Sequence, residues 1–159
     1  MVIINKYETL LDAAEQDGIA VTEKFDLSDT RFKGLYCDGV IAIDHTLTTN
    51  AEKNGILAEE LGHHYTSYGD IIELHSVEDQ KQELRARLWA YNKMIGLQGI
   101  VAAYKHGCTS LHDTAEFLEV TEEFLSEALE RYRSKYGCYV KLDNYVIYFE
   151  PVLGVLEMI

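Results

Sequence analysis

Residues 56–64 read I-L-A-E-E-L-G-H-H, and this stretch indicates a metal-binding helix. It nearly matches the H-E-x-x-H pattern, in which two histidines one helical turn apart bind zinc and the glutamate between them acts as general base. Here Glu60 stands at the base position and His63 at the second ligand position, while Glu59 replaces the first histidine. Catalysis by this stretch therefore depends on Glu59 serving as a ligand.

Two helical registers can place a glutamate and a histidine together, because residues four apart share one face of a helix. In the first, Glu59 and His63 are ligands, and Glu60, about 100° round the helix, is left to activate water. In the second, Glu60 and His64 are ligands, and the base position falls on Leu61, which has no acid–base chemistry. We favour the first register, with His64 as an accessory residue. The plain alternative is an exposed helical face with a Glu–His pair and no metal.

A zinc site needs a third protein ligand and an open position for water. Glu83 is the best candidate, because Ala86 and Ala90 share its face of the next predicted helix and would let that helix approach the metal helix closely. Gly62 would favour the same approach from the other side. Weaker candidates, in or beside the loop before that helix, are Glu73, Glu78 and His75.

Capping signals predict where the helices begin. Thr49-x-x-Glu52 forms a capping box at the start of the metal helix, and Ser76-x-x-Asp79 opens a longer helix that runs to about residue 95. Thr121 is a good N-cap for a helix over residues 122–135. The remaining predicted helices cover residues 7–16, 97–105 (ending at Gly107) and 111–118.

Strand signals lie near both ends of the chain. Residues 19–25 and 34–43 are rich in β-branched and aromatic side chains, and Asp38-Gly39 predicts a hairpin turn inside the second run. Residues 138–142 and 145–149 flank Asp143-Asn144 and predict a final hairpin.

Composition favours a soluble intracellular protein. The chain has 159 residues and a net charge of −13, which repels phosphate backbones and anionic lipids, so we expect no nucleic-acid or membrane partner and mildly favour a basic protein partner. No run reaches the ~18 apolar residues of a membrane span. The three widely spaced cysteines predict free buried thiols in a reducing cytoplasm.

The helices at 111–118 and 122–135, followed by a hairpin, also look like a winged helix-turn-helix. A recognition helix needs basic or amide side chains that reach bases and phosphates. Residues 110–136 instead hold seven acidic side chains against three basic ones. We therefore expect this module to pack or to dock a partner rather than to bind DNA.

The segments L-A-E-E-L-G-H-H (57–64) and K-Q-E-L-R-A-R-L-W-A (81–90) resemble the ImmA/IrrE family of metallopeptidases, peptidase family M78. The likeness is greatest to the compact members found beside phage and integrative-element repressors. It extends to K-G-L-Y-C-D-G-V-I-A-I-D (33–44) and E-F-L-E-V-T-E-E-F (116–124).

The resemblance implies roles for particular residues. Glu60 matches the general base, His63 the second metal ligand and Glu83 the third, while Glu59 departs from the family's histidine. The implied activity is a zinc-dependent endopeptidase that cleaves a helix-turn-helix repressor of a phage or mobile element. Manganese or iron becomes an option because Glu59 makes the ligand set richer in oxygen. The alternative is a catalytically weak or inactive member that binds and sequesters a repressor.

The expected fold class is α+β. A small antiparallel N-terminal sheet packs on a zincin-like two-helix metal core, and a helix-turn-helix-like module with a β-hairpin follows. Residues 1–107 are expected to form the metallopeptidase-like core, and residues 108–159 the C-terminal module, packed as part of the same domain.

Overall fold

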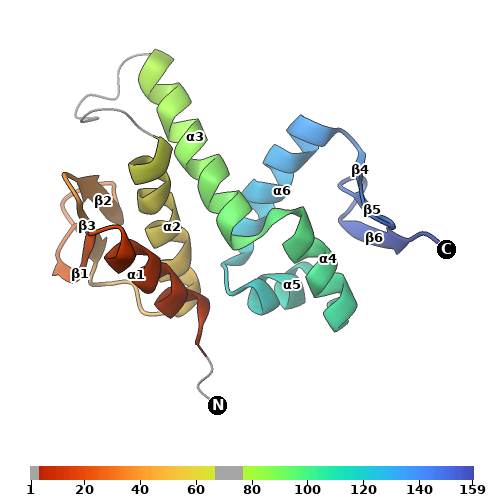
Figure 1. The fold of residues 1–159 in the computed structure, drawn as a ribbon, viewed down its shortest axis with the longest axis horizontal. Coiled ribbons are helices and arrows are strands. Elements are labelled where there is room, and N and C mark those ends of the chain that lie inside the picture. Colours follow the sequence, from red (N-terminus) through yellow and green to blue (C-terminus); the bar gives the residue numbers. More distant parts are fainter. Residues whose placement is uncertain (1–3, 67–76) are drawn as a thin grey trace. The chain divides into compact units, whose positions relative to one another are not determined.

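The computed structural model describes residues 4–66 and 77–159 (Figure 1). The chain divides into two compact units, Met1–Ala90 and Tyr91–Ile159. This division assigns residues 91–107 to the second unit, whereas the sequence-based one kept them with the first. The division at residue 107 stays a prediction.

The first unit combines helices with a small sheet, and Figure 1 shows α1 and α2 beside the three strands. In chain order its elements are α1 (Lys6–Gln16), β1 (Ala20–Phe25), β2 (Gly34–Cys37), β3 (Val40–Asp44), α2 (Asn50–Thr66) and α3 (Val77–Met94), whose last residues belong to the second unit. The predicted hairpin is confirmed, since Asp38 and Gly39 both have positive φ and join β2 to β3.

The second unit is a helical group followed by a sheet. Its elements are α4 (Gly96–His106), α5 (Leu111–Leu118), α6 (Glu122–Tyr136), β4 (Tyr139–Leu142), β5 (Tyr145–Tyr148) and β6 (Gly154–Glu157). The final hairpin of β4 and β5 is confirmed, and β6, which the sequence did not indicate, pairs with β5 as a third antiparallel strand. The helix-turn-helix likeness of α5 and α6 stays a prediction.

The predicted caps account for the helix ends. Thr49 Oγ1 accepts a hydrogen bond from the Glu52 amide at 3.2 Å, and the Glu52 carboxylate accepts one from the Thr49 amide at 3.3 Å, which completes the capping box of α2. Thr121 caps α6 through the Phe124 amide. Gly107 ends α4 with a left-handed φ of 98°. Ser76 lies outside the described residues.

The N-terminal sheet corrects one expectation. Its strand order is β1-β3-β2, and β1 pairs with β3 in parallel, so the prediction of an antiparallel sheet is wrong for this pair. The pairing of β2 with β3 is antiparallel, as expected. Ile41 and Ile43 on β3 are fully buried, so β3 takes the centre. The short 26–33 loop joins the end of β1 to the start of β2 at one end of β3, where Phe25 pairs with Asp44 and Gly34 with Ile43, and this connection makes β1 parallel to β3.

Two helices approach unusually closely in the first unit, as the small residues predicted. A Cβ added at Gly62 on α2 would lie 2.3 Å from the backbone carbonyl oxygen of Ala86 on α3. Ala86 and Ala90 are fully buried, as are Leu57 and Leu61 on α2. Only glycine allows this contact, because any side chain would meet backbone that cannot rotate away.

The cysteines are free thiols, but their predicted burial is wrong. Cys37 and Cys138 are exposed and Cys108 is half-buried. Cys37 lies beside the Asp38 turn, and Cys138 directly precedes β4, so both thiols are close to chain reversals that water reaches. None of the described helices combines the length and apolarity that crossing a bilayer requires.

Gly62→Ala should destabilise the first unit. In an open helix, glycine to alanine stabilises by about 0.5–1 kcal/mol, because alanine has fewer unfolded conformations to lose. At Gly62 the clash with the Ala86 backbone should reverse the sign and cost about 1–3 kcal/mol, measured by chemical denaturation. Gly99→Ala is the control, since its Cβ would meet only the end of the Leu118 side chain at 3.2 Å. An unchanged or more stable Gly62→Ala would mean that α2 and α3 are not this close.

Candidate metal centre

The close approach of α2 and α3 brings His63 and Glu83 together. His63 Nε2 lies 3.3 Å from Glu83 Oε1, with the two side chains 14% and 35% exposed. His63 follows the contact residue Gly62, and Glu83 lies three residues before Ala86. The predicted meeting of these two side chains is therefore observed, while their role as metal ligands stays a proposal.

Glu60 lies beside this pair in a setting that disfavours its charge. Burial is the largest cause that raises the pKa of Glu60 to about 7, and the carboxylates of Glu59 and Glu83 add to it. His63 and a hydrogen bond from the backbone amide of Tyr36 act in the opposite direction. The carboxyl group therefore has the surroundings of an acid–base group rather than of a surface glutamate.

The His63–Glu83 contact also changes the titration of both partners. Burial alone would lower the pKa of His63, but the hydrogen bond and charge of Glu83, with Glu60 and Glu59 behind it, outweigh burial and raise it. The bond from His63 is the largest cause of the lowered pKa of Glu83, and the charge of the nearby Arg87 contributes to it. The charges of three carboxylates thus act on one imidazole.

His64 has a different partner from His63. Its Nδ1 lies 2.8 Å from the hydroxyl group of Tyr36 on β2, and the two rings meet edge to face with centroids 5.4 Å apart. The second register would need His64 as a ligand, whereas this contact engages the ring with the edge strand. Sequence reasoning missed Tyr36. The available signal was the alternation of Gly34 and Tyr36, which places both on one face of β2.

The predicted ligands have not all gathered around one point. Within residues 4–66 and 77–159, the ligand atoms that lie within 4.8 Å of one another belong to Asp26, Asp44 and His45, and not to Glu59, His63 and Glu83. Glu59 is half-buried on the same helix as His63, and its charge acts on His63 and Glu60. Among the weaker candidates, Glu78 is exposed at the start of α3, and Glu73 and His75 lie outside the described residues.

Two observations are compatible with a divalent ion beside His63 and Glu83. Two ligands about 2.1 Å from a tetrahedral zinc ion are about 3.4 Å apart, close to the 3.3 Å between Nε2 and Oε1. The carboxylates of Glu59, Glu60 and Glu83 leave negative charge that a cation would offset.

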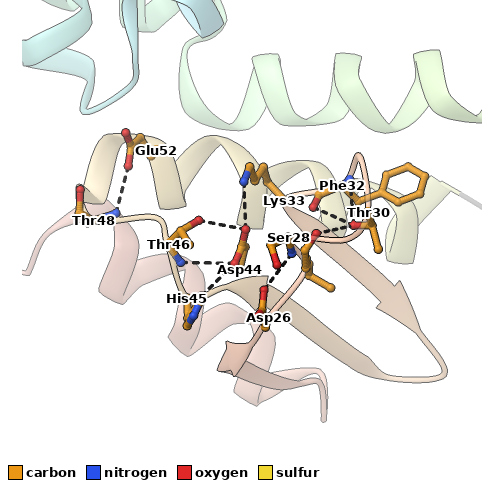
Figure 2. Close-up of polar contacts among 11 residues, drawn as sticks. Asp26, Ser28, Thr30, Phe32, Lys33, Asp44, His45, Thr46, Thr48 and Glu52 are labelled. Atoms are coloured by element: carbon orange, nitrogen blue, oxygen red, sulfur yellow. Dashed lines mark hydrogen bonds and ion pairs between the residues drawn. The ribbon is translucent and has the colours of Figure 1, made fainter.

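The group around Asp44 is a structural hub instead (Figure 2). The Asp44 side chain is fully buried and accepts hydrogen bonds from Lys33 Nζ at 3.0 Å and from Thr46 Oγ1 at 3.0 Å, and it contacts His45 Nδ1 at 3.1 Å. Burial alone would raise its pKa, but these bonds outweigh burial and hold the pKa of Asp44 well below its usual range. The Lys33 ammonium already supplies the positive charge, so Asp44 joins the end of β3 to the 26–33 loop.

Comparison with known proteins decides the family. The model of the IrrE N-terminal-like domain, peptidase family M78, matches residues 14–130, which is more than half of the chain. The chain belongs to this family. No curated protein and no solved structure gives a significant match.

Family membership confirms the coarse part of the sequence interpretation. The sequence segments indicated a metallopeptidase-like chain of α+β fold. The family is one of metallopeptidases and the chain has both helices and sheets, so this interpretation is confirmed. The matched range begins in α1 and ends in α6, and it contains Glu59, Glu60, His63 and Glu83. The C-terminal sheet of β4, β5 and β6 lies outside it.

The Asp44 hub should make folding stability depend on acid. A carboxylate whose pKa is lower in the folded chain stabilises the fold above its unfolded pKa of about 3.9, and this stabilisation is lost as pH falls through the folded value. Asp44→Asn should lower the melting temperature at pH 7, and the gap to wild type should narrow as pH falls below about 4. Asp29→Asn, an exposed aspartate of the same loop, is the control. A gap that stays constant down to pH 2 would contradict the hub.

Proposed function

We propose that this chain is a metal-dependent endopeptidase with Glu60 as general base and His63, Glu83 and Glu59 as metal ligands. The contact of 3.3 Å between His63 Nε2 and Glu83 Oε1 carries the proposal. It joins two helices through the residues that the motif spacing marks as ligands, and Glu60 lies beside it. Glu59 precedes His63 by four residues, so it shares the face of α2 that carries His63.

The chemistry divides between the ion and the protein. A zinc ion held there would lower the pKa of a water molecule and polarise the scissile carbonyl group. Glu60 would take the proton of that water and pass it to the leaving amine. His63 and Glu83 would hold the ion, and the hydrogen bond from the Tyr36 amide would hold the Glu60 carboxylate in place.

Glu59 shapes the choice of ion. With a carboxylate in place of the first imidazole, two anionic ligands and one histidine surround the metal, so their charge balances that of a divalent ion. A harder, oxygen-rich set moves preference from zinc toward manganese or iron. We propose zinc as the principal ion, with manganese or iron able to replace it.

The proposed substrate is a helix-turn-helix repressor of a phage or mobile element, cleaved in the cytoplasm. The net charge of −13 supports a basic protein partner and disfavours nucleic acid, because an acidic surface attracts the basic face with which a repressor binds DNA. The exposed acidic residues Glu122, Glu123 and Glu127 on α6 support partner docking by the C-terminal module. The second candidate, sequestration of a repressor without cleavage, is supported by the departure at Glu59.

His63→Ala should lose the metal. Wild type purified without chelator under zinc-replete conditions should carry about one divalent ion per chain, and His63→Ala should carry almost none with its helical circular dichroism retained. His112→Ala is the control, because His112 is an exposed histidine of α5. A wild-type chain without metal, or metal kept by His63→Ala, would contradict the ligand assignment.

Glu60→Gln should abolish cleavage of the repressor while metal content is unchanged. The amide has nearly the shape of the carboxylate but cannot take the proton of water. General acid–base catalysis contributes about 10²–10⁴ in rate, so we expect at least a hundredfold loss, measured by cleavage of a purified repressor. Glu15→Gln, an exposed acid on α1, should cleave normally. Residual activity above a tenth would assign the base elsewhere, and a wild type that binds the repressor without cutting it would favour sequestration.

A further inference from the structure

The edge strand β2 lies against the face of α2 that carries the general base. A Cβ at Gly34 would come within 2.5 Å of Ile56 Cγ2 and 3.0 Å of Glu60 Cγ, so Gly34 lies directly over Glu60. Tyr36, two residues along the strand, has its side chain on the same face. Its hydroxyl group reaches His64, one helical turn beyond Glu60.

The backbone amide of Tyr36 also points away from its partner strand β3. The two-residue turn at Asp38-Gly39 makes Cys37 and Val40 the closing pair, and hydrogen-bonded pairs alternate along an antiparallel ladder. Tyr36 and Ile41 then form a pair without ladder hydrogen bonds, and β2 has no strand on its other side. The Tyr36 amide is therefore free of the ladder. It belongs to the strand in which a Cβ at Gly34 would lie 3.2 Å from Glu60 Oε1, and its effect on the Glu60 pKa has the direction of a donated hydrogen bond.

We propose that Tyr36 is the positioning residue of the general base: its hydroxyl, held by His64, fixes the edge strand so that its backbone amide orients the Glu60 carboxylate. This rests on the proposed role of Glu60. Tyr36 would thus contact α2 at two positions four residues apart, Glu60 and His64. A carboxylate has two oxygens, so an amide on one leaves the other for the proton of water.

The ring of His64 is itself held in place. It meets the ring of Tyr65 edge to face with centroids 5.0 Å apart, and Tyr65 stacks on Trp89 of α3 at 5.0 Å. Tyr36, His64, Tyr65 and Trp89 therefore form a continuous aromatic row from β2 to α3. This row gives His64 a function in the first register, in which it is not a ligand.

The first test reads the amide directly, without any substrate. In protein labelled with [15N]tyrosine, at most 11 signals appear, one for each tyrosine. An amide that donates to a carboxylate resonates downfield, so the Tyr36 signal should move upfield in Glu60→Gln. His64→Leu should move it in the same direction. His64→Asn should restore it, because the asparagine amide can either accept from or donate to the Tyr36 hydroxyl.

The second test is kinetic and uses Tyr36→Phe. We expect kcat to fall on the order of tenfold with KM unchanged, less than the loss in Glu60→Gln, because positioning is only part of the 10²–10⁴ that general base catalysis contributes. Tyr7→Phe is the matched control, since it removes the hydroxyl that donates to Glu23 in the same unit, far along the chain from Glu60. It should leave both the Tyr36 signal and kcat unchanged.

Each outcome separates this proposal from the proposed function. A Tyr36 signal that does not move in Glu60→Gln or in His64→Leu overturns the positioning role, whatever the activity of the protein. Zinc lost in His64→Leu as completely as in His63→Ala would place His64 among the ligands and also overturn it. If wild type cleaves no repressor while the Tyr36 signal responds as expected, the positioning contact stands and the proposed activity fails.

Discussion

The contact between Gly62 and the backbone of Ala86 is the constraint on which the candidate centre depends. A helix pair separated by ordinary side chains holds its axes 8–10 Å apart, and residues on facing helices then need long side chains to meet. Here the absence of a side chain at Gly62 lets the backbone of α3 contact α2. The short side chains of the buried Ala86 and Ala90 allow the two helices to stay close along the interface. His63 and Glu83 flank this contact, so their meeting is a consequence of it.

The centre concentrates negative charge in a partly buried place. Glu59, Glu60 and Glu83 act on one another and on His63, and this mutual effect explains the directions in which their pKa values move. Such an arrangement has little value for stability, because burying like charges costs free energy. Its persistence in a chain of the M78 family is understandable if a cation offsets the charge, which is the chemical basis of the proposed activity.

Two polar groups in the first unit show how similar residues serve different ends. Asp44 accepts hydrogen bonds from Lys33 and from the amide and hydroxyl of Thr46, and these bonds favour its charged form, so the group joins β3 to its neighbouring loop. Burial is the largest cause that disfavours the charged form of Glu60, and the two nearby carboxylates add to it while few donors offset it. The difference lies in the balance of donors and charges, not in the type of side chain, and it separates a structural carboxylate from a candidate base.

The sequence by itself indicated the helices, the two hairpin turns and the residues proposed as base and ligands of the candidate centre. Capping at Thr49 and Thr121, the Asp38-Gly39 turn and the spacing of Glu59, Glu60 and His63 act within a few residues, so local patterns reveal them. Glu83 was found because small residues on one helical face mark a close approach. Only the tertiary structure decided that β1 pairs in parallel with β3, that β6 completes the second sheet, and that the Tyr36 hydroxyl reaches His64. Strand order and contacts across 28 residues depend on which apolar segments are buried together, and that competition is settled by the whole unit rather than by any local run.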